Sequence, residues 1–127
     1  GYKRRFSIPY CTSCRLVLRL VANQYKNAKV DLTATTATTL YTCPTATTAI
    51  IKSILVSEDS GNADTITVTI TDSASAVFSV FKTKAVGANT TVELLTAPLV
   101  IEESEIVKVT AATADRLHVV ASLLEVS

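Results

Sequence analysis

The chain contains no tryptophan, no methionine, a single histidine and only three glycines. Because His118 is alone and no glycine-rich run could cradle a phosphate, the usual arrangements for nucleophilic or phosphate chemistry are missing. The sequence also lacks a nucleophile elbow of the Gly-x-Ser-x-Gly type. We therefore predict that the protein is not an enzyme and uses no cofactor.

The length and the hydrophobic fraction of the chain predict a single folded domain. The chain has 127 residues, of which 48% are hydrophobic, a fraction typical of folded rather than disordered proteins. Its apolar runs fall well short of the ~20 residues that a membrane helix needs, so we expect no membrane partner. Residues 15–21 are apolar but contain Arg19, and this short, interrupted run does not suit a cleavable signal peptide.

The three cysteines do not suggest a disulfide framework. An odd number cannot all pair within the chain, and a domain of this length can form a core without such links. Cys11 and Cys14 have the spacing of half a zinc site, but the other candidate ligands, Cys43 and His118, do not form a second close pair. We therefore predict no metal site, with Cys11 and Cys14 as free thiols in a flexible arm.

Charge divides the chain into two parts. Residues 1–20 contain five basic residues and no acidic one, whereas the remainder contains seven basic and eleven acidic residues. We therefore expect a basic N-terminal arm or non-native extension at residues 1–21 and a separate domain at residues 22–127. Aromatic residues among the basic ones would allow stacking on nucleic acid: Tyr2, Phe6 and Tyr10. A solvated or non-native extension is the favoured interpretation, and nucleic acid is not the expected partner.

An almost unbroken alternation of threonine with branched apolar residues runs from Asp64 to Asp72. Successive side chains of a β-strand point to opposite faces, so Ile66, Val68 and Ile70 share one face and the threonines share the other. We predict that the apolar face packs in the core and that the threonine face meets solvent or a neighbour. Ice-binding solenoids also carry threonine arrays, but they need a repeated coil, and the sequence has no internal repeat.

Short strands separated by turn residues follow one another from residue 29 onwards. The apolar and β-branched patterns predict strands at residues 29–32, 40–43, 49–58, 64–72, 77–84, 91–95, 99–101, 106–111 and 117–126. The short connections require antiparallel pairing, because parallel strands need longer crossovers. The predicted fold is an all-β, antiparallel β-sandwich or jelly-roll-like domain of eight or nine short strands. Within the strand at 49–58, residues 49–56 are apolar on both faces, which predicts burial of both, in the sandwich or at a subunit interface.

The charged residues of the domain are weak candidates for chemistry. His118 lies in a predicted strand without an identifiable serine or cysteine partner, and we expect a packed or surface residue. An acidic turn lacks the register of a calcium loop and is expected to be solvated: Glu102, Glu103 and Glu105. Aspartates at strand ends are expected to bond nearby backbone groups: Asp59, Asp64 and Asp72. We therefore assign no catalytic, cofactor-binding or metal-binding residue.

Five stretches of the domain resemble one family of proteins. They begin at Ala22, Leu40, Ala49, Ala97 and Arg116 and read Ala-Asn-Gln-Tyr-Lys-Asn-Ala-Lys-Val-Asp-Leu-Thr, Leu-Tyr-Thr-Cys-Pro-Thr, Ala-Ile-Ile-Lys-Ser-Ile-Leu-Val-Ser-Glu-Asp, Ala-Pro-Leu-Val-Ile-Glu and Arg-Leu-His-Val-Val-Ala-Ser-Leu-Leu-Glu-Val-Ser. In order and spacing, the chain resembles small virion structural proteins of tailed bacteriophages, including cyanobacterial phages, over residues 22–127. Two turns depart from that pattern, because the family reads Pro-Ala-Gly where this chain has Pro44-Thr-Ala, and glycine where it has Ser104.

The resemblance implies a non-enzymatic virion structural protein of the type that decorates or cements a capsid. It further implies a homo-oligomer, a trimer by analogy with similar capsid decorations, that contacts phage capsid or tail proteins within the virion. A neck- or tail-associated structural protein is the first alternative. The second is a carbohydrate-binding host-adhesion module, for which the domain supplies few aromatic residues: Tyr25, Tyr41, Phe78 and Phe81.

Overall fold

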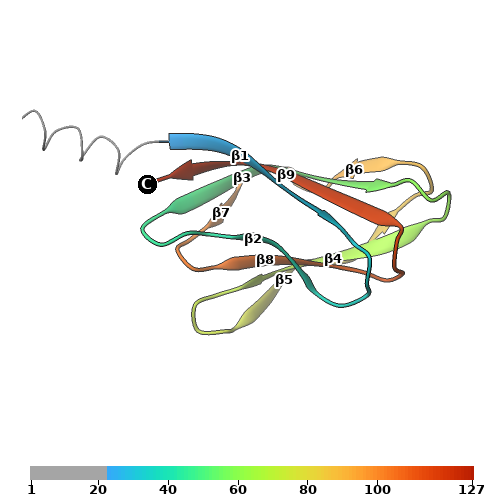
Figure 1. Cartoon of the computed structure of the whole chain (residues 1–127), viewed down its shortest axis with the longest axis horizontal. Helices are drawn as coiled ribbons and strands as arrows, with labels where there is room; N and C mark the ends of the chain where they lie inside the picture. Colours follow the sequence, from blue (N-terminus) through green and yellow to red (C-terminus); the bar gives the residue numbers. More distant parts are fainter. Residues whose placement is uncertain (1–22) are drawn as a thin grey trace, which may run out of the picture.

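Two antiparallel sheets pack face to face in the computed structural model, which describes residues 23–127 (Figure 1). The strands are β1 (Asn23–Asp31), β2 (Thr38–Thr42), β3 (Thr48–Glu58), β4 (Asp64–Thr71), β5 (Val77–Val86), β6 (Thr91–Glu93), β7 (Leu99–Ile101), β8 (Ile106–Ala111) and β9 (Leu117–Val126). The five-stranded sheet has the order β1-β9-β3-β6, with β7 also paired to β3, and the four-stranded sheet has the order β2-β8-β4-β5. Every pairing is antiparallel, so the predicted all-β fold class is confirmed.

Late strands insert between early ones in both sheets. β9 lies between β1 and β3, and β8 lies between β2 and β4, so the chain returns to close each sheet (Figure 1). β6 and β7 pair with different halves of β3 and together fill one strand position. This arrangement, in which the closing strands run back beside the opening ones, is that of a jelly roll. The jelly-roll-like prediction is therefore confirmed.

The core lies between the inner faces of the two sheets. Along β9, Leu117, Val119, Ala121 and Leu123 are buried, whereas the residues between them point outward. Residues opposite these on β3 and β1 point to the same side, because paired residues of antiparallel strands share a face. The inner face of the five-stranded sheet is thus apolar along its middle, with the charged residues Glu58 and Glu125 toward its two ends.

The threonine-rich segment forms β4 in the centre of the four-stranded sheet. Ile66 and Val68 have no exposed surface, and Ile70 is half-buried and packs against the core. The threonines of β4 lie on the opposite face and are half-buried. The predicted division of this strand into a core face and a threonine face is confirmed.

The first strand is longer than the sequence predicts. β1 begins at Asn23, six residues before the expected start at residue 29, and pairs with β9 along its whole length. Because β1 is an edge strand with most of its side chains exposed, residues 23–28 show no apolar alternation. The expected basic arm at residues 1–21, with Cys11 and Cys14, lies outside the described residues.

Only one face of β3 is buried within the sandwich. Ala49, Ile51, Ile54 and Val56 are buried, whereas Leu55 on the other face is 39% exposed. A β-bulge between Ile51 and Ser53 shifts the alternation and keeps the side chains on either side of it in phase with β9. The prediction that the sandwich buries both faces of this strand is therefore wrong. The alternative, a subunit interface at the second face, stays a prediction.

Two turns at one end of the sandwich hold non-glycine residues in the left-handed region. Ala46 has a φ of 57° and Ser104 a φ of 67°. The turns are joined, since the Ser104 N–H donates to the Cys43 carbonyl at 3.0 Å and the Ala46 N–H to the Glu103 carboxylate at 2.5 Å. These are the two positions at which the resembled family carries glycine. A residue with a Cβ costs about 1–2 kcal/mol in this conformation.

We predict that Ala46→Gly and Ser104→Gly each stabilise the protein by about 0.5 kcal/mol. Glycine removes the strain of the left-handed conformation in the folded state. It also makes the unfolded chain more flexible, which favours unfolding by about 0.4–1 kcal/mol. Because the strain is the larger of the two effects, we expect a small net gain in stability. Urea denaturation measures the change. Ala74→Gly is the matched control, because Ala74 has no positive φ and its replacement should destabilise the protein. Destabilisation by both turn variants would contradict the prediction.

Candidate functional site

The outer faces of the two sheets carry different side chains. The outer face of the four-stranded sheet is rich in threonine, at Thr39, Thr42, Thr65, Thr67, Thr69, Thr71 and Thr110. In residues 23–127 six large hydrophobic side chains are exposed, and four of them lie on the outer face of the five-stranded sheet: Tyr25, Leu55, Val100 and Val120. The other two, Val77 and Phe78, lie on the edge strand β5. We call the outer side of the five-stranded sheet the apolar face.

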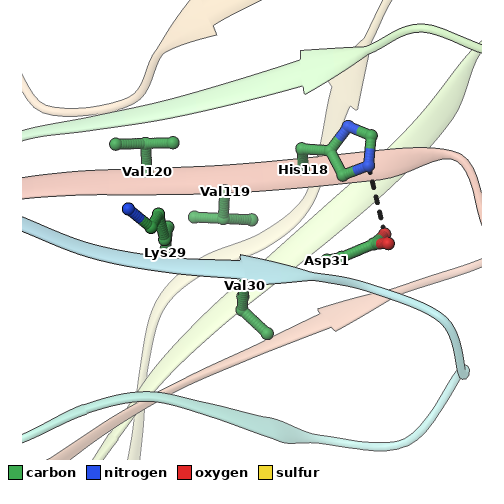
Figure 2. Close-up of a pocket in the computed structure, with 6 residues that line it drawn as sticks. All are labelled: Lys29, Val30, Asp31, His118, Val119 and Val120. Carbon is green, nitrogen blue, oxygen red and sulfur yellow. Dashed lines mark ion pairs between the residues drawn. The ribbon is translucent and has the colours of Figure 1, made fainter.

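At one end of the apolar face, His118 lies between two carboxylates. Its Nε2 is 3.2 Å from Asp31 Oδ1, and its Nδ1 is 3.4 Å from Asp59 Oδ2. Asp31 ends β1 and Asp59 follows β3, and β9 with His118 lies between these strands. Figure 2 shows His118 reaching toward Asp31, with Val120 on the same side of the sheet and Val30 on the other. A shallow hollow of about 270 Å³ runs between β1 and β9 here.

The His118 cluster has the geometry of a surface ion-pair network. Each ring nitrogen already faces a carboxylate, so neither is directed at a substrate. Within residues 23–127 no group of three or more histidine, cysteine, aspartate or glutamate residues is arranged to hold a metal ion. All three side chains are 44–61% exposed, and exposed pairs contribute only about 0–1 kcal/mol each. The expected surface position of His118 is confirmed, while its two carboxylate partners come from distant segments that the sequence does not link.

A buried polar network connects the two sheets at the opposite end. The Tyr41 hydroxyl on β2 donates to Oε2 of Glu125 on β9 at 2.5 Å, and Lys26 Nζ lies 3.0 Å from Oε1. Burial opposes ionisation of Glu125, but its bonds to Tyr41 and Lys26 outweigh that effect and lower its pKa. Burial, together with the neighbouring carboxylate, raises the pKa of Tyr41. The phenol therefore stays protonated as a donor, and the network is suited to holding the sheets together.

Cys43 is a buried thiol beside this network. It is 1% exposed, and its Sγ donates to the Thr47 carbonyl at 3.2 Å. Burial raises the pKa of the thiol, which disfavours the reactive thiolate. Cys43 precedes β3 and His118 pairs with Ser57 near the end of that strand, so the two residues considered as zinc ligands lie at opposite ends of the sandwich.

Glu58, which the sequence did not single out, organises two loops at the His118 end. Its buried carboxylate accepts backbone N–H groups of Ser60 at 2.9 Å, Gly61 at 3.0 Å and Asn89 at 3.0 Å, and also the Ser60 hydroxyl. Burial opposes its ionisation, but these hydrogen bonds outweigh burial and lower the pKa of Glu58 to about 2. Its donors follow it by two, three and 31 residues, so only the nearest could have been found from the sequence.

The acidic residues at the other turns match their predictions only in part. Glu105 accepts the Glu102 N–H at 2.8 Å, and Glu103 and Glu102 are exposed. Asp72 accepts the N–H groups of Ala74 and Ala76 within its own turn, each at 2.9 Å. Asp64 instead reaches the distant Thr113 N–H at 3.0 Å, and Asp59 pairs with His118. The expectation of nearby backbone partners is thus confirmed for Asp72 and not met by the contacts of Asp64 and Asp59.

The four aromatic residues considered for sugar binding are not gathered in one place. The Tyr41 hydroxyl is used inside the fold, and Phe81 packs against the core. Phe78 is 58% exposed on β5, whereas Tyr25 is 77% exposed on β1 in the other sheet. Tyr25 borders a shallow hollow of about 310 Å³ with Asn27, Lys52 and Ser122, and Lys52 Nζ lies 5.8 Å from its ring centre.

We predict that Glu58→Gln destabilises the fold and reduces its loss of stability in acid. A lowered pKa means that the carboxylate contributes stability above its ordinary pKa of about 4.3. That contribution is lost as the pH falls through about 2. Denaturation curves from pH 6 to 2 measure the slope, to which Glu93 and Glu125 also contribute because their pKa values are lowered. The exposed Glu102→Gln is the matched control, and an unchanged slope in Glu58→Gln would contradict the prediction.

Comparisons with known proteins reveal the fold but no family. No family model and no curated protein matches the chain. Among solved structures, the chain is similar to a protein of Bacillus endospore appendages, described as disulfide-linked pili, with a TM-score of 0.51 and 14% identity over 83% of this chain and 85% of that one. It is also similar to a chain of infectious bursal disease virus strain Gt, with a TM-score of 0.42 and 11% identity over 84% of this chain and 31% of that one. At such identities the likeness describes the fold alone. Residues 23–127 contain no helix that is long and apolar enough to cross a membrane.

Proposed function

We propose that the chain is a non-enzymatic structural protein of a tailed-phage virion, of the capsid decoration or cement type. The observation that carries the proposal is the apolar face, where Tyr25, Leu55, Val100 and Val120 are exposed together on one sheet. Exposed apolar side chains that gather on one face of a folded domain mark a surface that another protein covers. The protein works by fitting this surface against a neighbour in the particle.

The rigidity of the domain suits a protein that docks against a neighbour in a particle. Buried carboxylates fasten both ends of the sandwich, through Glu125 at one end and Glu58 at the other. A rigid scaffold loses little conformational entropy on docking, so its surface binds without reorganisation. The threonine-rich face on the opposite side is half-buried and stays in β conformation without a large exposed apolar side chain on β4.

Self-assembly is part of the proposal. The Bacillus appendage protein, which shares the fold, is described as forming pili, and we extend only the coarse property of assembly to this chain. Its partners are further copies of itself and capsid or tail proteins of the phage, which follows from the resemblance over residues 22–127. A neck- or tail-associated position is the alternative within the same class, because the apolar face would serve either.

Phage particles that carry the gene for this chain should contain the protein at a fixed copy number on the capsid surface. Mass spectrometry of purified particles detects it, and cryo-electron microscopy locates it. Density at the neck or tail would support the alternative position. Absence of the protein from purified particles would overturn the proposal in both forms.

Carbohydrate binding is a second candidate, favoured by the hollow beside Tyr25. An exposed aromatic ring bordered by Asn27, Lys52 and Ser122 offers a stacking surface with polar partners. If this hollow binds a glycan, Tyr25→Ala should abolish binding on a glycan array. Phe78→Ala is the matched control, since Phe78 is a similarly exposed aromatic residue on the other sheet. Equal loss in both variants, or no binding by the wild type, would reject this candidate.

A further inference from the structure

The apolar face is organised in rows of side chains that cross the strands. Residues opposite each other on antiparallel strands point to the same side and lie about 5 Å apart. One row crosses β1, β9, β3 and β7 and is entirely apolar or aromatic: Tyr25, Leu124, Ile50 and Val100. We call it the apolar row. Its two end residues are largely exposed, and its two central residues are half-buried.

A second row crosses β1, β9, β3 and β6, and we call it the mixed row. Its members are Lys29, Val120, Leu55 and Glu93. Val120 and Leu55 in the middle are 37% and 39% exposed. An exposed cation therefore stands at the β1 end of the row and an exposed anion at the β6 end.

The anion of the mixed row is held in a fixed position. The Glu93 carboxylate accepts the Ile54 N–H at 2.8 Å and the Leu95 N–H at 3.2 Å, and it also accepts the Ser53 hydroxyl. Burial opposes ionisation of Glu93, but these hydrogen bonds outweigh it and lower its pKa. The carboxylate is thus ionised and oriented before any partner arrives.

Both rows are self-complementary under one symmetry operation. A two-fold axis parallel to the strands, lying between β9 and β3, places a second copy face to face and reverses each row from left to right. In the mixed row it brings Val120 over Leu55 of the partner subunit and Lys29 over Glu93 of the partner subunit. In the apolar row it brings Tyr25 over Val100 of the partner subunit and Leu124 over Ile50 of the partner subunit.

The geometry points to a two-fold symmetric homodimer formed through the apolar face, with Lys29 paired to the partner's Glu93. The occupant is a second copy because the two residues at the ends of the mixed row are opposite in charge, and the strands that carry them, β1 and β6, are equidistant from the axis. A two-fold interface uses the same patch on both subunits, so each copy supplies both the cation and the anion. Aligned sheets also pack readily face to face, about 10 Å apart.

The remaining rows suit the edges and the centre of such an interface. Asn27, Ser122 and Ser53 form a polar row between the two described above, and the exposed Lys52 side chain from the β3 bulge lies across it, with its Nζ 5.8 Å from the Tyr25 ring centre. His118 and Asp31 lie at the rim, where exposed ion pairs are common. Four strands of this length present about 600 Å² per copy, so that a dimer buries about 1,200 Å² in total, the lower limit of stable interfaces.

This inference deepens the proposed function, because it says which face meets another copy, but its test does not need a phage particle. Failure to find the protein in virions would leave the dimer intact. Conversely, a protein that joins the capsid as a monomer or trimer would satisfy the proposed function and reject the dimer.

The dimer is tested with the full chain by analytical ultracentrifugation over a concentration series. We expect Leu55→Lys to weaken the dimer by about 100-fold or more, because it buries an amine against the partner's Val120. The fold should survive, since Leu55 lies on the outer face beside Glu93. Thr69→Glu on the threonine-rich face, opposite Lys108, is the matched control and should leave the dimer unchanged.

Charge reversal tests the predicted pairing. Lys29→Glu should weaken the dimer by about tenfold, because it places two carboxylates together, whereas Lys84→Glu on β5 should have no effect. A zero-length carbodiimide cross-link should join Lys29 to Glu93 of the partner subunit in mixtures of isotope-labelled and unlabelled protein. Within one chain the two backbones are about 14 Å apart, three strand spacings, and the isotope mixture distinguishes an internal link from one between subunits. A monomer, a trimer, or a dimer that survives Leu55→Lys would overturn the inference.

Discussion

The pairing register of β9 is the constraint on which the rest of the structure depends. This strand lies between β1 and β3 and is paired along its length with both. A slip of one residue would turn Leu117 and Val119 out of the core and bring Val120 and Leu124 into it. The same register therefore produces the core on one side of the sheet and the rows of the apolar face on the other. The composition of the core could not change without a change in the rows of the apolar face.

Two buried carboxylates reinforce that register by making errors costly. Glu125 occupies an inward position of β9, where Tyr41 of the opposite sheet reaches it, and Glu58 occupies an inward position at the end of β3. A slip of β9 by one residue would turn Glu125 away from Tyr41, and a slip by two residues would keep Glu125 on the inner face without that donor. Apolar contacts can form in several strand registers, whereas the hydrogen bonds of these carboxylates form in only one register. The fold is thus made compact by its buried apolar core and specific by its carboxylates.

The sequence predicts what depends on alternation and misses what depends on pairing. The last three strands were predicted with the bounds that the structure has, because buried and exposed positions alternate cleanly along them. Residues 23–28 were missed because an edge strand need not alternate. The partners of His118 and the donors to Glu58 come from segments that only the sheet order brings together. The rows of the apolar face likewise require the register of four strands.

A jelly roll does not by itself identify a function, because function depends on the surfaces that the fold carries. An antiparallel strand with one face in water ordinarily alternates apolar with polar residues. β4 follows that rule with its threonines, whereas Leu55 on β3 and Val120 on β9 break it. Threonine would have kept these strands in β conformation equally well, so strand formation does not explain the apolar choice. Under the proposed function, contact with another protein explains it, and this contrast between the two outer faces is our reason for placing that contact on the five-stranded sheet.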